Sequence, residues 1–169
     1  MQARLARTPA STPFHPMSRK PRNSRPIDSL LARFRLRIRR SRIHRLGVFA
    51  GELIPPRKYV IEYGGRLIRS RDAAREVRKP GRPNRILMAR LNRAWIIDAI
   101  AGGSGAEYIN HSCEPNLFIR KTRGHFFLVS RRRIGRGEEL TMDYKLRPKK
   151  PRCACHCGSR KCRGFMNLP

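Results

Sequence analysis

The chain has 169 residues, and 40 Lys and Arg against 11 Asp and Glu give it a formal net charge of +29 at pH 7. This length suits one domain with its own core, plus a tail. The positive excess predicts attraction to polyanions, to nucleic acid before anionic membranes or acidic proteins. The sequence has no apolar run that could span a bilayer and no secretory signal, so we expect an intracellular protein that does not cross a membrane.

The first 31 residues are rich in Arg, Ser and Pro and show no apolar periodicity. Such a composition buries too little apolar surface to offset the entropy lost on ordering, so residues 1–31 are predicted to form a disordered basic arm. We expect the arginines of this arm to contact DNA or RNA phosphates without reading base sequence.

Beyond the arm, the pattern indicates short strands separated by turns. In the segment RFRLRIRRSRI, apolar Phe34, Leu36 and Ile38 alternate with arginines, a period of two that is typical of a strand with one buried face. The best helical pattern covers residues 70–79, with Ser70 as its N-cap. Further strands are predicted at 47–50, 58–65, 85–99 (two strands around a turn), 124–130 and 138–144. The sequence therefore predicts a mostly β protein with one or two short helices.

Four of the five cysteines fall within ten residues near the C-terminus, at Cys153, Cys155, Cys157 and Cys162. This tight, odd-numbered set is a poor disulfide framework and is typical of a metal site in a reducing compartment. Three thiolates within residues 155–162 would repel one another without a cation, and Zn²⁺ takes four sulfur ligands in a tetrahedron. Cys113 is the first candidate for the fourth ligand, and Cys153 and His156 compete with it. A cluster of reactive thiols without metal is the alternative.

Five segments occur in a particular order: SRIHRLGVFA, YVIEYGG, YINHSCEPN, GEELTMDY and CHCGSRKCRGFMN. In this order they resemble the SET-domain protein lysine methyltransferases with a post-SET tail, over about residues 34–169. The resemblance implies a SET domain at 32–147 and a zinc-binding post-SET tail at 148–169. It also implies the β-clip fold, which consists of small sheets and short helices. In this fold the NHS segment threads a loop closed by the C-terminal strand, as a pseudoknot.

The same resemblance implies S-adenosylmethionine as methyl donor and a lysine of a protein as acceptor. It places cofactor contacts at Leu46, Gly47, Asn110, His111, Tyr144 and Phe165. It assigns the catalytic lysine channel to Tyr144, Tyr63 and Tyr108. It assigns structural Zn²⁺ to Cys113, Cys155, Cys157 and Cys162.

The expected chemistry has a clear physical requirement. A free lysine has a pKa of about 10.4, so presenting it neutral at pH 7 costs about 4–5 kcal/mol. A nearby sulfonium cation and a dry, apolar channel both disfavour the ammonium form. The methyl displacement that remains needs alignment more than covalent help.

Several residues depart from the family pattern. Arg45 replaces the first glycine of a Gly-x-Gly sequence. Arg66 and Glu107 reverse the usual charges at their positions, and we expect them to pair. Met142 replaces Phe or Tyr at the position that limits how many methyl groups are added. Methionine has no hydroxyl to hold a water there, so the pocket is predicted to accept more than one methylation.

The charge predicts the kind of partner. Because a +29 enzyme repels a bare cationic tail, the expected substrate is a basic protein already bound to nucleic acid, such as a histone or a nucleoid or ribosomal protein. This places the protein on chromatin in a eukaryote and in the nucleoid or cytoplasm in a bacterium. Two alternatives remain open: a catalytically inactive SET-like domain acting as a basic nucleic-acid-binding module, and a plain zinc-knuckle nucleic-acid binder.

Overall fold

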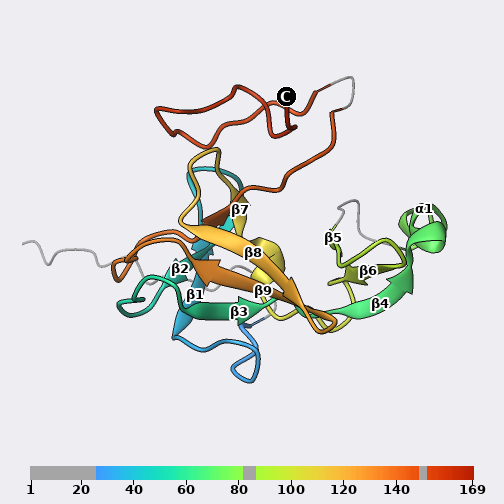
Figure 1. Cartoon of the computed structure of the whole chain (residues 1–169), viewed down its shortest axis with the longest axis horizontal. Coiled ribbons are helices and arrows are strands. Elements are labelled where there is room, and N and C mark those ends of the chain that lie inside the picture. Colours follow the sequence, from blue (N-terminus) through green and yellow to red (C-terminus); the bar gives the residue numbers. More distant parts are fainter. Residues whose placement is uncertain (1–25, 82–86, 149–151) are drawn as a thin grey trace, which may run out of the picture.

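The computed structural model describes residues 26–81, 87–148 and 152–169 (Figure 1). Most of the predicted basic arm and part of the loop at 79–85 lie outside the described residues. Within them, the chain forms ten short strands in four small sheets, with three short helical segments. The prediction of a mostly β protein is confirmed. No helix among the described residues is long and apolar enough to cross a membrane.

The elements follow one another in a simple order. The strands are β1 (Leu36–Arg40), β2 (Leu46–Ala50), β3 (Tyr59–Glu62), β4 (Arg66–Arg69), β5 (Met88–Arg90), β6 (Trp95–Asp98), β7 (Asn110–His111), β8 (Leu117–Thr122), β9 (His125–Ser130) and β10 (Thr141–Met142). The helical segments are η1 (Ser70–Asp72), α1 (Ala73–Val77) and η2 (Ala106–Tyr108). The sheets are β1-β2, β3-β9-β8, β4-β6-β5 and the parallel pair β7-β10.

The first hairpin confirms the predicted period of two. β1 and β2 pair antiparallel, with Leu36 opposite Ala50. Leu36 and Ile38 are half-buried and pack against the core, whereas Arg37 and Arg39 are exposed. One strand thus carries an apolar face and an arginine face.

The sheet β4-β6-β5 lies to one side of the molecule, with α1 beyond it (Figure 1). The turn between β5 and β6 is closed by the side-chain oxygen of Asn92, which accepts hydrogen bonds from the N–H groups of Ala94 and Trp95, both at 2.9 Å.

The predicted helix forms as η1 followed by α1, but the predicted N-cap at Ser70 is wrong. The N–H of Ser70 continues the ladder to the carbonyl of Ala94 at 2.8 Å, and its hydroxyl accepts a bond from Arg90 at 3.2 Å.

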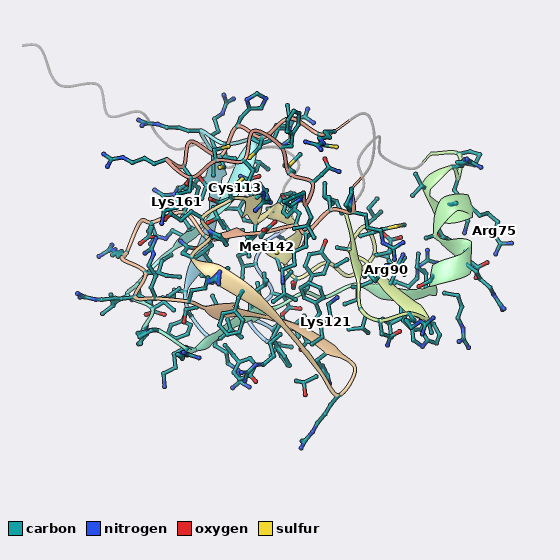
Figure 2. All side chains as sticks on the ribbon, turned by 45° about the horizontal axis from the view of Figure 1, so that its top comes forward. Arg75, Arg90, Cys113, Lys121, Met142 and Lys161 are labelled. Carbon is teal, nitrogen blue, oxygen red and sulfur yellow. The ribbon has the colours of Figure 1, made fainter. Side chains whose placement is uncertain are left out.

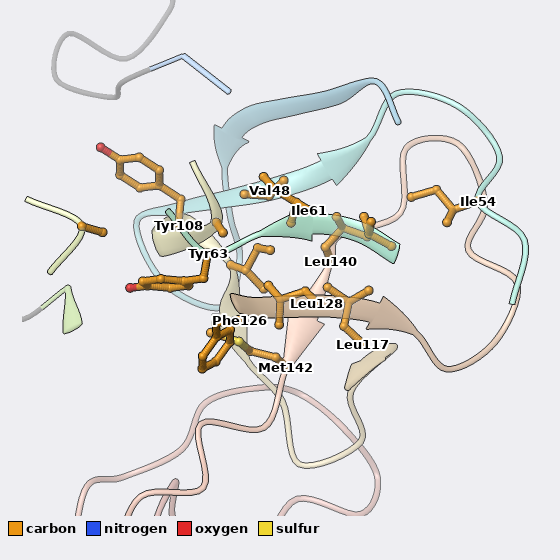
Figure 3. Packing of buried hydrophobic residues seen from close by; sticks show 14 of the residues in the cluster. Val48, Ile54, Ile61, Tyr63, Tyr108, Leu117, Phe126, Leu128, Leu140 and Met142 are labelled. Carbon is orange, nitrogen blue, oxygen red and sulfur yellow. The ribbon is translucent and has the colours of Figure 1, made fainter. Parts of the chain in front are cut away.

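The core collects apolar side chains from several sheets (Figure 3). Val48, Ile61, Leu128 and Leu140 are each at most 1% exposed. Short strands with frequent turns bury these side chains only by packing sheet against sheet. The polar segments between the strands are thereby brought together at one end of the core.

The pair β7-β10 joins segments that lie far apart in the sequence. Asn110 lies opposite Thr141, and His111 lies opposite Met142. The buried side chain of Asn116 donates to the carbonyl of Glu139 at 2.8 Å and accepts from the N–H of Thr141 at 2.8 Å. The NHS segment is therefore held against the C-terminal strand, as the resemblance to the SET fold implies.

Residues 26–31 pack on the domain, although they were expected to belong to the arm. The N–H of Asp28 donates to the carbonyl of Ser104 at 2.9 Å. Ile27 is partly buried against the core, and its side chain occupies the space where Gly105 lacks a Cβ. The structured part of the chain therefore begins before the predicted boundary at residue 32.

Candidate active site and thiolate cluster

The tail brings four thiols together. The sulfur atoms of the group lie within 4.8 Å of one another, and the group consists of Cys113, Cys155, Cys157 and Cys162. The Sγ atoms of Cys113 and Cys155 are 3.7 Å apart. A tetrahedral zinc site with Zn–S bonds of about 2.3 Å has an edge of about 3.8 Å, so this donor set fits Zn²⁺. Cys153, which is exposed, and His156 lie outside the group.

Backbone hydrogen bonds position the sulfurs. The N–H of Arg163 donates to the Sγ of Cys113 at 3.4 Å, and the N–H of Gly164 donates to the Sγ of Cys162 at 3.4 Å. Burial raises the pKa of the Cys155 thiol to about 12. Burial also acts on Cys157, but hydrogen bonds from the backbone of Cys113 and Ser159 outweigh it and lower the pKa of that thiol to about 6. Thiolates this close repel one another, so a bound cation stabilises the full set.

His111 connects this cluster to Tyr144. Its imidazole is buried, and its Nε2 lies 3.4 Å from the Sγ of Cys113. Its Nδ1 accepts the N–H of Tyr144 at 3.2 Å, so the ring proton is on Nε2 and faces the sulfur. The His111 and Tyr144 rings also meet edge to face, with centroids 5.4 Å apart. Burial lowers the pKa of His111, which favours this neutral form.

Arg163 makes a second connection between the tail and the strand that leads to Tyr144. Its guanidinium donates to both carboxylate oxygens of Asp143, at 2.9 and 3.1 Å. Among the described residues, its Nε is the one buried side-chain nitrogen or oxygen without a hydrogen-bond partner. Two independent side chains therefore tie the thiolate cluster to the segment Asp143–Tyr144. Sequence reasoning missed Arg163 because it is one of many arginines in the tail.

Asn110 organises the loop before β2. Its side-chain amide donates to the carbonyl of Leu46 at 2.9 Å and to the carboxylate of Glu139 at 2.8 Å. Glu139 also accepts from the hydroxyl of Ser41, at 2.8 and 2.9 Å. A Cβ at Gly47 would collide with the same carboxylate, so any side chain at this position would displace Glu139 from its hydrogen bonds. Glu139 is a second residue that sequence reasoning missed, since nothing in the GEEL sequence marks it as a contact of this loop.

The side chains of Asn110 and His111 are thus used inside the protein. Leu46, Gly47, Asn110, His111 and Tyr144 form one continuous region, linked by the hydrogen bonds above. Phe165 comes from the tail, where its ring is 38% exposed.

The three tyrosines expected in the channel differ in environment. Tyr63 and Tyr108 are buried, and Tyr144 is half-buried. The Tyr144 hydroxyl donates to the carbonyl of Ile109 at 3.0 Å. Burial raises the pKa of Tyr144 to about 12, and burial together with nearby acidic groups raises that of Tyr63 further. The phenols of Tyr63 and Tyr144 are therefore neutral hydrogen-bonding groups near pH 7.

Met142 and Phe126 belong to the same buried cluster as Tyr63. Figure 3 shows Phe126 between the labelled Tyr63 and Met142. The ring centroids of Tyr63 and Phe126 are 5.4 Å apart. Met142 is buried, at 8% exposure. Sequence reasoning placed Phe126 on a strand but gave no signal that it faces the tyrosines.

The residues that depart from the family pattern are also placed. Arg45 has a φ of 40°, a left-handed conformation that glycine adopts more cheaply. Arg66 does not form the expected pair with Glu107. Its guanidinium instead lies 2.6 Å from Glu76 and 3.7 Å from Asp98. Hydrogen bonds from Lys79 and Arg66 lower the pKa of Glu76.

Comparison with known families agrees with this fold. The family model described as SET domain matches residues 45–145, which is more than half of the chain. The chain belongs to the SET-domain family.

Individual relatives are much longer proteins. Histone-lysine N-methyltransferase 2D of Homo sapiens is 40% identical over 135 residues, which are 76% of this chain and 2% of that protein. Histone-lysine N-methyltransferase, H3 lysine-4 specific, of Schizosaccharomyces pombe is 39% identical over 133 residues, 75% of this chain and 14% of that protein. The crystal structure of KRYPTONITE in complex with mCHG DNA and SAH superposes with a TM-score of 0.67 at 29% identity, over 80% of this chain and 29% of that chain. The chain therefore spans a small part of the proteins that it matches.

Proposed function

We propose that this SET domain transfers a methyl group from S-adenosylmethionine to the side-chain amine of a lysine in a protein. The observation that carries the proposal is the position of Tyr144. Its hydroxyl is bonded beside the Asn110–His111 strand, and Tyr63 and Met142 are buried in the same core. Relatives named histone-lysine N-methyltransferases, and a solved relative that contains SAH, support the reaction class.

The cofactor would bind where the loop before β2 meets β7. Leu46, Gly47 and the backbone of Asn110 and His111 form that surface, and Phe165 offers an apolar ring from the tail. The bonds from Asn110 to Leu46 and Glu139 hold the loop in place before binding, so less ordering entropy is lost when the cofactor binds. The bound cofactor supplies a methyl group on a cationic sulfur.

The residues of this chain then have three tasks. Tyr63, Tyr108 and Met142 exclude water, which disfavours the ammonium form of the incoming lysine. The Tyr144 hydroxyl, neutral because its pKa is about 12, orients the reacting groups by hydrogen bonding and does not act as a base. Tyr63 would hydrogen-bond the amine in the channel. The rate then depends on alignment.

Met142 sets the product in this proposal. A buried methionine provides polarizable apolar volume and no hydroxyl. No water is then anchored beside the amine, so mono- and dimethyl-lysine still fit. We expect more than one methylation, and Met142→Tyr should shift the products toward monomethyl-lysine in a mass-spectrometric time course. A wild-type series that stops strictly at monomethyl-lysine would contradict this assignment.

Zn²⁺ is the structural metal in the proposal, held by Cys113 and the three tail cysteines. It would fix the tail that carries Phe165 against the site. It has no part in the methyl transfer itself. The His111 and Arg163 contacts make the order of the tail and the position of Tyr144 depend on each other.

Nucleic acid would hold the enzyme near its substrate. The exposed arginine face of β1 lies next to the basic loop at 131–136, since Arg39 donates to the carbonyl of Gly137 at 3.4 Å. Arg131, Arg133 and Arg136 are all exposed in that loop. Such a surface suits phosphate contacts without base reading, and binding should weaken steeply with added salt. A histone on chromatin is the substrate class that the named relatives favour.

A labelled-methyl transfer assay tests the function. Histones, a nucleoid protein and ribosomal proteins are offered with S-adenosylmethionine, and the wild type runs beside Tyr144→Phe. We expect transfer to lysine that falls about a hundredfold in the variant. Tyr59→Phe is the matched control, because Tyr59 is an exposed tyrosine on β3 whose hydroxyl accepts only from Arg120 in the described structure.

An inactive nucleic-acid-binding module is the second candidate, and the strained, exposed Arg45 in the cofactor loop favours it. Calorimetric titration with S-adenosylmethionine separates the two. Saturable binding by the wild type supports the enzyme. Salt-sensitive nucleic-acid binding without any cofactor binding supports the module.

A further inference from the structure

One lysine of the chain faces the proposed channel. On β8, Leu117, Ile119 and Lys121 lie on the same face of the strand; Leu117 is buried, Ile119 is half-buried and Lys121, toward the end of the strand, is exposed. Lys121 lies opposite Phe126 in the β8-β9 register, and its Nζ is 5.3 Å from the centre of the Phe126 ring. Since Phe126 in turn packs on Tyr63, one aromatic ring separates this ammonium from the channel tyrosine.

Two further cations lie beside Lys121. Arg90 ends β5, and Lys145 directly follows Tyr144. Partial burial, and then the positive charges of Arg90 and Lys145, lower the pKa of Lys121. In Figure 2, Lys121 and Arg90 lie on the side of Met142 that faces away from Cys113. We call Arg90, Lys121 and Lys145 the cationic rim.

The rim is not neutralised by the protein. Among the described residues, no carboxylate lies within ion-pair distance of any of its three members, and the recorded side-chain partner of Arg90 is the neutral hydroxyl of Ser70 at 3.2 Å. This contrasts with Arg66 on the neighbouring strand β4, which binds two acids. Three positive charges without a described carboxylate partner favour the approach of an anionic group over that of a cationic one.

We propose that the cationic rim selects target lysines flanked by acidic residues. The proposal rests on the lysine methyltransferase function proposed above, and it replaces the expectation of a basic sequence around the target. Aspartate or glutamate within a few residues of the lysine would approach Arg90, Lys121 and Lys145 as the lysine enters the channel. Arginine at the same positions would be repelled. Nucleic acid would then recruit the whole substrate protein, while the rim chooses the lysine.

Three peptides of equal length test the rim, each with one central lysine flanked by Asp, Ser or Arg. We measure methyl transfer as kcat/KM and, separately, binding by fluorescence anisotropy without nucleic acid. We expect the Asp peptide to exceed the Ser peptide about tenfold and the Ser peptide to exceed the Arg peptide by a similar factor, as for a few partly exposed ion pairs. The differences should shrink to about twofold in 0.5 M salt because of screening.

Lys121→Glu should reverse the preference, so that kcat/KM becomes higher for the Arg peptide than for the Asp peptide. Lys58→Glu is the matched control, because Lys58 is exposed and lies at the opposite end of the sheet, bonded through its N–H to Ser130. It changes the net charge equally and should leave the order unchanged.

The two proposals can fail separately. Methylation of all three peptides at equal rates, or best transfer to the Arg peptide, would overturn the rim and leave the enzyme intact. Absence of transfer to any peptide would count against the enzyme. The anisotropy series with Lys121→Glu would still decide whether the rim prefers acidic flanks.

Discussion

Two regions of this molecule are built on different principles. Around β7, β10 and the tail, directional hydrogen bonds use nearly every polar side chain, as in the His111 imidazole held between Cys113 and Tyr144. Around β4, β5 and α1, charge dominates, with Arg66 held between Glu76 and Asp98 and with Arg90 unpaired by any described carboxylate. In the first region, directional hydrogen bonds fix the positions of side chains. The second sets electrostatic preference and tolerates exchange of side chains. Substitutions in the first region should therefore abolish methyl transfer. Substitutions in the second region should change which substrate lysines are preferred.

Breaking the thiolate cluster should have the largest effect. Cys113→Ser removes one of four metal ligands, and structural zinc stabilises small folds by about 10 kcal/mol. We expect loss of bound zinc, proteolysis after the last core strand, and a fall in methyl transfer of more than a hundredfold. Metal analysis and limited proteolysis measure the first two effects.

Cys153→Ser is the control for this experiment, because Cys153 is exposed and lies outside the cluster. It should keep full zinc content and activity. Equal damage from both substitutions would mean that the four-sulfur assignment is wrong.

The pH dependence of methyl transfer tests the role of Tyr144. Its pKa of about 12 keeps the phenol protonated up to pH 10, so of the phenol and the substrate lysine, which has a pKa of about 10.4, the lysine loses its proton first. The rate should rise about tenfold per pH unit below pH 9. Tyr144→Phe should lower kcat about a hundredfold and leave this slope unchanged.

The comparison of pH profiles also shows what would refute this role. An ionisation below pH 10 that is present in the wild type and absent in Tyr144→Phe would mean that the phenol acts as a base. Cofactor binding, measured alongside, should change by less than about threefold, because the hydroxyl is bonded to a backbone carbonyl and not to the loop before β2.

Adding a methyl group at Gly47 tests the packing of the loop before β2 against Glu139. Gly47→Ala places a methyl group against the carboxylate of Glu139, and overpacking of this kind costs about 1–3 kcal/mol. We expect a lower free energy of unfolding in urea and weaker cofactor binding. Gly135→Ala, where the nearest atom to a new Cβ is 4.0 Å away, should change stability by less than about 0.5 kcal/mol. Equal stability of the two variants would contradict the close contact with Glu139.

The smallest expected effect is an increase in stability on substitution of Arg45. Arg45 adopts a φ of 40°, and glycine relieves that strain, partly offset by its greater freedom in the unfolded chain. Arg45→Gly should therefore raise the free energy of unfolding by about 0.5–1 kcal/mol. Arg42→Gly, at an exposed position without positive φ, should lower it by a similar amount. If both variants lose stability, the conformation of Arg45 carries no strain.

The thiolate cluster was predictable because it depends on the chemistry of particular side chains. Thiols spaced as in residues 155–162 favour a bound cation, Cys113 was the first candidate for the fourth ligand, and the structure groups these four sulfurs. Alternation in β1 and the turn at Asn92 follow from local patterns of burial and turn geometry. The Ser70 cap failed because a neighbouring strand, invisible in the local sequence, bonds its backbone first.

The sequence by itself determined which elements form, which residues are able to bind metal, and the large positive charge, since these depend on residue type and short-range spacing. The tertiary structure decided the contacts between distant segments. It placed His111 between Cys113 and Tyr144, it brought Glu139 against Gly47, and it brought Arg90 and Lys145 close enough for their charges to act on Lys121. The physical reason is that directional bonds and unscreened charges act over a few ångströms, and only the folded chain brings residues that are tens of positions apart to that distance.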